Sequence, residues 1–119
     1  MAKGQLDLIR GTLDVLILKA LAWGQLHGYA ITRLIRLRTE DVLLVEEGTL
    51  YPALWRLEEK GLVAAEWGLS ENNRKAKFYR LTPAGERQLR KETKVWTAYA
   101  AAVGKMLSAT DSPLAESTR

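Results

Sequence analysis

The spacing of apolar residues along the chain predicts three short helices, then a β-hairpin and a long final helix. The first helix is expected over residues 13–23, with Thr12 capping its start and Gly24 ending it. Apolar residues recur at intervals of three and four on its core-facing side, at Leu6, Ile9, Leu13, Leu16, Ile17, Ala20 and Leu21. A second apolar stripe follows its other side, at Leu8, Val15, Leu18 and Ala22. Because a surface helix should not be apolar nearly all round, we expect this helix to contact a partner subunit.

Two further helices are expected before the hairpin. The second follows His27 and ends near Arg38. The third begins at residue 48 or 49, carries Pro52 in or just after its first turn, and stops at Gly61. The apolar residues of the third helix that face inward are Leu50, Leu54 and Leu57.

The β-hairpin is expected from residues 62–67 and 75–81, joined by the polar stretch 68–74. Asn72 and Asn73 tolerate the positive φ angles that its tip requires. Thr82 and Pro83 then restart a helix as cap and first helical residue.

The final helix should run to about Leu107 and carries an apolar seam that the core has no room for. This seam consists of Leu89, Trp96, Tyr99, Val103 and Met106. A dimer would bury it. Residues 108–119 are small and polar and are expected to form a flexible tail.

This order of elements is typical of a winged helix-turn-helix, a mainly α (α+β) fold. We expect a winged-helix DNA-binding domain over residues 6–82 with a two-stranded β wing, and a C-terminal dimerisation helix over residues 83–107. In this fold the third helix enters the major groove of DNA and the hairpin reaches an adjacent groove.

Composition narrows the function classes. A chain of 119 residues suits one domain and is too short for a separate catalytic domain. It contains no cysteine, which excludes disulfides and thiolate metal sites. No apolar run reaches the roughly 20 residues of a membrane span, and the N-terminal segment has no small-residue cleavage site. We therefore expect a soluble, cytoplasmic protein.

The charge favours an anionic partner. The net charge is +4 and the isoelectric point is about 9.5. Between residues 74 and 94 lie eight lysines and arginines against two glutamates. Acidic residues gather instead at Glu40, Asp41, Glu46 and Glu47. Such clustering is typical of one positive face.

Several segments in the same order resemble the PadR family of transcriptional regulators. The most specific is Gly48-Thr49-Leu50-Tyr51-Pro52-Ala53-Leu54. The others are Gly11-Thr12-Leu13-Asp14, His27-Gly28-Tyr29-Ala30-Ile31, Arg56-Leu57-Glu58 and Tyr79-Arg80-Leu81-Thr82-Pro83-Ala84-Gly85. The resemblance spans about residues 6–107, and the short C-terminal part resembles the compact subgroup with one extra helix. It implies a homodimer that binds a pseudo-palindromic operator on double-stranded DNA, represses transcription and is often released by a small-molecule effector.

The DNA contacts are expected on two elements. On the third helix the positions that face away from the core are Thr49, Tyr51, Pro52, Trp55 and Arg56. Hydroxyl groups near the helix start can donate to phosphates or bases, and Arg56 can pair with phosphate or guanine. Around the wing loop, Arg74, Lys75 and Lys77 are expected to contact phosphate or the minor groove. Alternatively, Tyr51 and Trp55 only pack against neighbours and the wing cations are only solvated.

A further pocket follows from the resemblance. It implies a site for a planar aromatic effector at the dimer interface, lined by Leu8, Val15, Trp96, Tyr99 and Val103. Packing alone would also account for Trp96, and the sequence does not separate the two interpretations.

No cofactor, metal or catalytic centre is expected. His27 is the single histidine and has no cysteine or carboxylate partners in the pattern of a metal site, so we expect it to order the start of the second helix. The glutamate pairs 46–47 and 58–59 do not face one another and accompany no nucleophile, so an enzyme is the least favoured class. The main alternative to a DNA-binding regulator is a winged-helix module that binds another protein. That module would carry acidic or apolar residues where this chain has basic ones.

Overall fold

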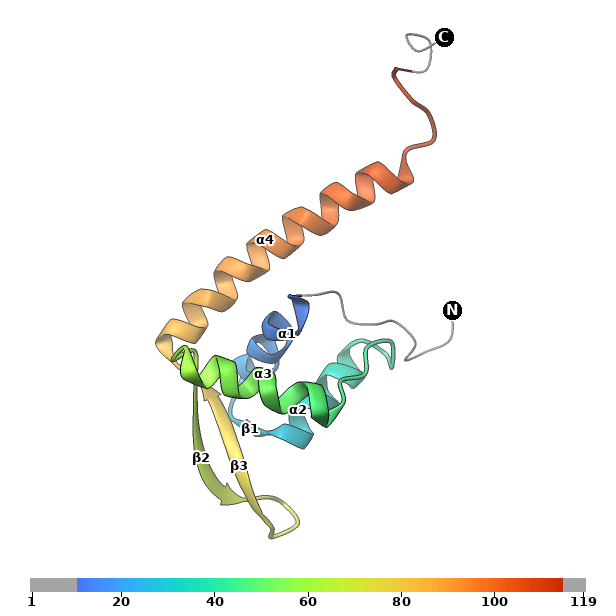
Figure 1. Cartoon of the computed structure of the whole chain (residues 1–119). Coiled ribbons are helices and arrows are strands. Elements are labelled where there is room, and N and C mark those ends of the chain that lie inside the picture. The colour runs from blue at the N-terminus through green and yellow to red at the C-terminus, as the bar shows by residue number, and fades with distance from the viewer. Residues whose placement is uncertain (1–10, 115–119) are drawn as a thin grey trace.

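The computed structural model describes residues 11–114 and has a mainly helical, winged-helix architecture (Figure 1). In chain order its elements are α1 (Thr12–Ala20), the 3-10 helix η1 (Leu21–Trp23), β1 (Leu26–His27), α2 (Gly28–Arg38), α3 (Glu47–Glu59), β2 (Val63–Leu69), β3 (Lys75–Leu81) and α4 (Pro83–Ser108). The β2–β3 hairpin projects from one end of the helical body, and α4 starts beside the base of the hairpin and extends in the opposite direction, beyond the body (Figure 1).

The first helix differs from the prediction at both ends. Thr12 is the first helical residue, so the expectation that it caps the helix is wrong. The capping position belongs to Gly11, whose φ of 89° lies in the left-handed region that glycine adopts at little cost. At the other end the last three residues tighten into η1 before Gly24, which ends the segment as predicted with φ 141°.

The sheet has three strands in the order β1-β3-β2, where the prediction had two. The additional strand pairs antiparallel with β3 through Leu26 opposite Tyr79 and His27 opposite Phe78. Two residues are too few to show the alternation of apolar and polar positions by which a strand is recognised. The wing itself is the predicted hairpin, and Asn73 at its tip has φ 59°.

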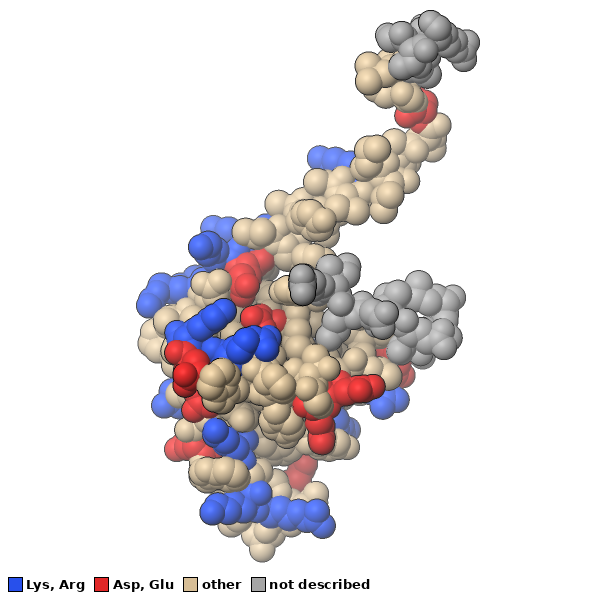
Figure 2. Space-filling view, in the orientation of Figure 1, with Lys and Arg blue, Asp and Glu red and all other residues tan. Residues whose placement is uncertain are grey.

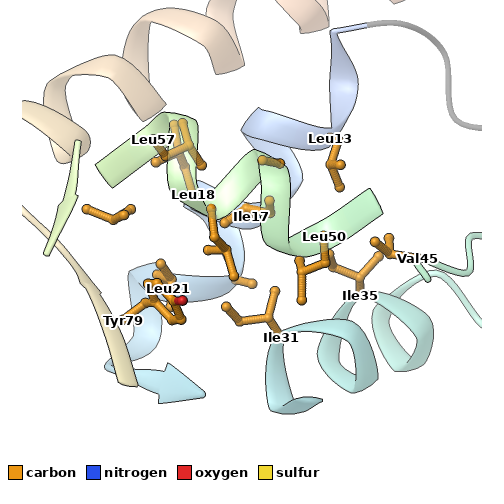
Figure 3. Close-up of a cluster of buried hydrophobic side chains, with 14 residues drawn as sticks. Leu13, Ile17, Leu18, Leu21, Ile31, Ile35, Val45, Leu50, Leu57 and Tyr79 are labelled. Atoms are coloured by element: carbon orange, nitrogen blue, oxygen red, sulfur yellow. The ribbon is translucent and has the colours of Figure 1, made fainter. Parts of the chain in front are cut away.

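The core lies between α1, α2, α3 and the base of the hairpin (Figure 3). Its largest fully buried side chains are Ile17, Leu18, Ile31, Leu50, Leu54, Leu57 and Val63. Leu18 was expected on the outer stripe of the first helix, and its complete burial corrects that expectation. The reason is that α1 packs against α2, α3 and α4, so more of its surface is covered than the helical pattern alone indicates.

The third helix starts at Glu47, one or two residues earlier than predicted, which makes Pro52 its sixth residue. Gly61 ends it as predicted, with φ 73°. Two backbone hydrogen bonds close this end: the Leu62 N–H donates to the Leu57 carbonyl at 3.0 Å, and the Gly61 N–H donates to the Glu58 carbonyl at 3.0 Å. The chain then turns directly into β2.

The start of α4 is fixed to the end of α3. The Thr82 hydroxyl accepts from the Gly85 N–H at 3.0 Å, which is the predicted cap, and donates to the Gly61 carbonyl at 2.6 Å. Beyond Glu92 the side chains of α4 are exposed in the protomer, including most of the predicted seam. The helix ends at Ser108, one residue past the predicted end.

Candidate nucleic-acid interface

Helix α3 crosses the front of the molecule with one face buried and the other open (Figures 1 and 3). The five residues predicted to face away from the core are all exposed: Thr49, Tyr51, Pro52, Trp55 and Arg56. Trp55 is 63% exposed, so its indole is available to a partner molecule and is not part of the core. The spacing of three and four residues that buries Leu50, Leu54 and Leu57 produces this arrangement.

Tyr51 lies at the contact between α3 and α2. Its ring packs on Gly28, where an added Cβ would overlap the hydroxyl and lie 2.8 Å from ring atom Cε1. Burial, and to a smaller extent the neighbouring Glu47 carboxylate, raise the pKa of Tyr51. The hydroxyl therefore stays protonated at neutral pH and can donate a hydrogen bond to an acceptor such as a phosphate oxygen.

A groove of about 570 Å³ separates the start of α2 and Tyr51 from the wing. Its wall on the wing carries three of the predicted DNA contacts, Arg74, Lys75 and Lys77. The remaining lining residues are His27, Gly28, Tyr29, Tyr51, Trp67, Ser70, Glu71, Asn72, Ala76 and Tyr79. The fold therefore brings the tyrosine of α3 and the cations of the wing to one surface. Thr49, Pro52, Trp55 and Arg56 lie outside this groove on the open face of α3.

Four aromatic or imidazole side chains of the groove were not among the predicted contacts: His27, Tyr29, Trp67 and Tyr79. His27 caps α2, because its Nδ1 accepts from the Ala30 N–H at 3.2 Å, which matches its expected ordering role. Its ring stacks on Tyr29, with the ring centroids 6.4 Å apart. Trp67 lies opposite Lys77 in the hairpin and is 63% exposed, with the Lys75 Nζ 5.4 Å from its ring centroid. Cross-strand register could have identified Trp67, since positions 67 and 77 share one face of the hairpin.

Two of the predicted basic contacts have partners inside the protomer. The Lys77 Nζ lies 3.5 Å from Oε1 of Glu58, and the Arg56 Nη2 lies 3.6 Å from Oδ1 of Asp14. Both pairs are partly exposed, so each is weak and can exchange for another anion. Within residues 11–114, neither Arg74 nor Lys75 forms an ion pair, and basic side chains gather at the wing end of the molecule, at the bottom of Figure 2.

A second cavity of about 330 Å³ lies between α1 and α4. It is lined by three of the residues expected to hold an effector, Val15, Trp96 and Tyr99, together with Gly11, Thr12, Lys91, Glu92 and Val95. The Trp96 and Tyr99 ring centroids are 6.1 Å apart. Val103 does not line this cavity, and Leu8 lies outside the described residues.

Glu92 is the acidic residue of the second cavity. Burial first, and then the negative charge of Asp14, raise the pKa of Glu92. A hydrogen bond with Gln88 and the charges of Lys60 and Lys91 act in the opposite direction. The wall of the cavity is thus electrostatically connected to α1.

Neither a metal site nor a membrane span is present in the part of the chain that the structure describes. No group of three or more histidine and carboxylate side chains among these residues could hold a metal ion. Nor does any helix within residues 11–114 combine the length and the apolar character needed to cross a membrane.

Comparison with known proteins gives a consistent result. Residues 17–91 match the model of the transcriptional regulator PadR-like family. An uncharacterised protein of Lysinibacillus sphaericus is 37% identical over 90 residues, which cover 76% of this chain and 83% of that protein.

Solved structures of transcriptional regulators are also similar. One from Clostridium thermocellum is 33% identical with a TM-score of 0.74, covering 84% of this chain and 97% of the other. A PadR family regulator from Eggerthella lenta is 36% identical with a TM-score of 0.71, covering 85% and 86% of the two chains.

Proposed function

The chain belongs to the PadR-like family of transcriptional regulators, and we propose that it represses transcription by binding a pseudo-palindromic operator as a homodimer. The observation that carries the proposal is the shared surface of Tyr51 on α3 and Lys75 and Lys77 on the wing, across one groove. Helix α3 fits the major groove, where the hydroxyl group of Tyr51 can contact base edges or phosphates. The cations of the hairpin beside it can bind the phosphate backbone.

The proposed contacts divide into two kinds. Thr49, Tyr51, Pro52, Trp55 and Arg56 contact base edges and phosphates from α3. Arg74, Lys75 and Lys77 contact phosphates or the minor groove from the wing and contribute affinity more than sequence choice. Glu46 and Glu47 at the start of α3 are exposed acidic residues, so the positive potential comes mainly from the wing.

The proposed homodimer rests on the apolar side of α4. Val95, Tyr99, Val103 and Met106 are exposed in the protomer on a helix that projects from the body (Figure 1). A two-fold interface would bury them and would place the α3 helices of the two subunits on a two-fold operator. We propose residues 6–82 as the DNA-binding domain and residues 83–107 as the dimerisation helix.

We further propose that a planar aromatic effector binds the α1–α4 cavity. The specific observation is the tilted pair of Trp96 and Tyr99 on one wall, with Val15 on α1 as part of the same lining. Two aromatic faces can stack a flat molecule. The expected result is a change in tryptophan fluorescence on titration with a panel of such compounds, reduced in Trp96→Ala; a flat response across the panel contradicts this part.

Beyond these contacts, we propose that the protein acts in the cytoplasm, without catalytic activity of its own. The groove offers cations and hydroxyl donors, and these are groups that bind an anion. A protein-binding winged helix is the alternative, and a wing tip of Arg74 and Lys75 argues against it because acidic or apolar residues would be expected there.

The experiment is equilibrium binding by fluorescence anisotropy to a duplex from the upstream promoter of the chain's own gene and to a scrambled duplex, at several salt concentrations. We expect preference for the promoter duplex, and binding that weakens steeply with salt. Tyr51→Ala should reduce the preference. Lys77→Ala should lower the slope of log K against log salt by about one for each phosphate that the lysine neutralises in the wild-type complex.

Arg80→Ala is the matched control, because Arg80 lies on β3 three residues from Lys77 and therefore on the other face of the strand. It removes the same charge away from the groove and should have a much smaller effect. Equal, weak binding of both duplexes by the wild-type protein would contradict the proposal and favour the protein-binding alternative.

A further inference from the structure

Arg56 and Asp14 connect the open face of α3 to α1. Arg56 Nη2 lies 3.6 Å from Asp14 Oδ1, with side-chain exposures of 50% for the arginine and 26% for the aspartate. Arg56 thus reaches solvent on the face of α3 proposed to meet DNA, while its head group is drawn toward α1. A partly exposed pair at this distance is weak, so the arginine can leave it.

Asp14 does not depend on Arg56 for its own placement. It lies in the first turn of α1, where the dipole of the helix and its free N–H groups favour a negative charge. When Arg56 moves to another anion, Asp14 therefore keeps a favourable position. A DNA phosphate is such an anion, and it competes with Asp14 for the same guanidinium.

Asp14 also acts electrostatically on the wall of the α1–α4 cavity, through Glu92. Glu92 lines that cavity, and, after burial, the negative charge of Asp14 helps to raise the pKa of Glu92. Val15, the residue after Asp14, lines the same cavity. Asp14, the partner of Arg56, therefore lies next to a residue that lines the cavity.

We propose that Asp14 is a positioning residue that holds Arg56 back from DNA. DNA binding breaks the Arg56–Asp14 pair and replaces the carboxylate by a phosphate. Neutralisation of Asp14 therefore releases the arginine. This inference rests on the proposed DNA-binding function and adds to it a residue that lies outside the DNA-contacting surface.

The test is a double-mutant cycle on promoter DNA affinity with Asp14→Asn, Arg56→Gln and the double variant, read by anisotropy at one fixed salt concentration. Asp14→Asn keeps the size of the side chain and one acceptor oxygen while removing the charge, and its thermal unfolding is measured beside that of the wild type. We expect Asp14→Asn to tighten binding by about two- to fivefold, the fold-change that corresponds to a partly exposed ion pair. In the Arg56→Gln background the same substitution should give no gain, because the pair is already absent.

Glu59→Gln is the matched control for charge, because Glu59 is an exposed carboxylate of α3. Any gain that it gives comes from lower net negative charge and should be equal in both Arg56 backgrounds.

Two results would overturn the inference while leaving the proposed function intact. One is an equal gain from Asp14→Asn with and without Arg56, which would reduce Asp14 to a general repulsive charge. The other is weaker binding by Asp14→Asn when Arg56 is present, which would mean that Asp14 orients the arginine toward DNA. Wild-type protein that fails to distinguish promoter from scrambled DNA would overturn the proposed function and this inference together.

Discussion

At the scale of single residues, Gly28 determines how close Tyr51 can lie to α2. The position is buried, and an added Cβ would overlap the tyrosine hydroxyl and ring. Tyr51 is 43% exposed, so its ring can swing outward when the space beside it is filled. A methyl group at residue 28 should therefore displace the proposed DNA contact more than it destabilises the fold.

Gly28→Ala is expected to lower promoter affinity by about as much as Tyr51→Ala, and to cost about 1 kcal/mol or less of unfolding free energy. Anisotropy and urea unfolding measure the two quantities. Gly48→Ala is the control for unfolding, because a Cβ there meets nothing within 4 Å and alanine favours a helix. A Gly28→Ala variant with wild-type DNA affinity would show that Tyr51 can move without consequence.

Glu92 gives a second prediction at this scale. Because burial and the charge of Asp14 raise its pKa, the folded state binds a proton at Glu92 more readily than the unfolded state does. Stability therefore increases as the pH falls through the folded-state pKa, and the ionised side chain costs stability at neutral pH. Glu92→Gln should raise the thermal midpoint at pH 7 by about 1–2 °C, since solvent screens a partly exposed charge.

The gain from Glu92→Gln should shrink as the pH is lowered toward about 4, where the wild-type carboxyl group is protonated. Calorimetry at several pH values measures it, and Glu66→Gln at an exposed position of β2 controls for the removal of one negative charge. A gain that stays constant across this pH range would argue against the assignment to Glu92.

The residues of the candidate interface also show which site residues could be predicted from the sequence. Thr49, Tyr51 and Trp55 follow from helical spacing alone, because the apolar residues between them fix which side of α3 is open. His27, Tyr29 and Trp67 could not be found in the same way. Cross-strand register places Trp67 beside Lys77, but His27 and Tyr29 reach the groove only through the tertiary packing of β1 and α2.

At the scale of elements, the junction of α4 with the hairpin is the most constrained contact. Gly85 is buried in the first turn of α4, where a Cβ would overlap the backbone carbonyl oxygen of Leu62. Backbone cannot rotate away as a side chain can, so the helix would have to shift. The hydrogen bonds of Thr82 fix the same turn to Gly61.

Gly85→Ala should therefore destabilise the protein by about 1–3 kcal/mol, the usual cost of overpacking. At an open helical position, replacing glycine by alanine stabilises the helix by about 1 kcal/mol. A net destabilisation by Gly85→Ala would therefore show that the steric overlap is the larger effect. Urea unfolding measures the change. Ala98→Ser, at an exposed position of the same helix, should lie within about 0.5 kcal/mol of wild type. Neutral or stabilising behaviour of Gly85→Ala would contradict the tight junction.

The element order and most boundaries could be predicted from sequence, because apolar spacing, Gly61, Thr82 and Pro83 are local signals. The third strand could not, since β1 has two residues and exists through its pairing with β3. The burial of Leu18 could not be predicted either, because it also depends on tertiary packing. A helical pattern shows which sides of α1 are apolar, but not which of them the other helices cover.

At the scale of the whole molecule, α4 projects from the body with an apolar side that nothing in the described part of the protomer covers (Figure 1). The principal dimensions of 68 × 33 × 22 Å reflect this projecting helix. The apolar spacing of α4 predicted a seam that the core of one protomer does not bury. The angle between the two subunits of the proposed dimer could not be predicted, because it depends on side-chain packing between the two chains.

Val103→Asp should convert the proposed dimer to a monomer and lower operator affinity, because a charge would be buried in the interface. Val103 is exposed in the protomer, so the substitution should leave the fold of the single chain in place. Ala101→Asp, two residues away and on the opposite side of the helix, is the matched control. Sedimentation at micromolar concentration measures the assembly, and a monomeric wild-type protein would contradict the dimer.

In the proposed complex, two subunits bind an operator symmetrically, each through its α3 and wing. DNase footprinting on the promoter of the chain's own gene tests this arrangement most directly. The predicted result is one protected region with two-fold symmetry, in which the half-sites lie about 10 base pairs apart or a multiple of this, and which disappears with Tyr51→Ala and Lys77→Ala combined. Uniform protection of all sequences, or no protection at concentrations that saturate the duplex in solution, would contradict sequence-specific regulation by this surface.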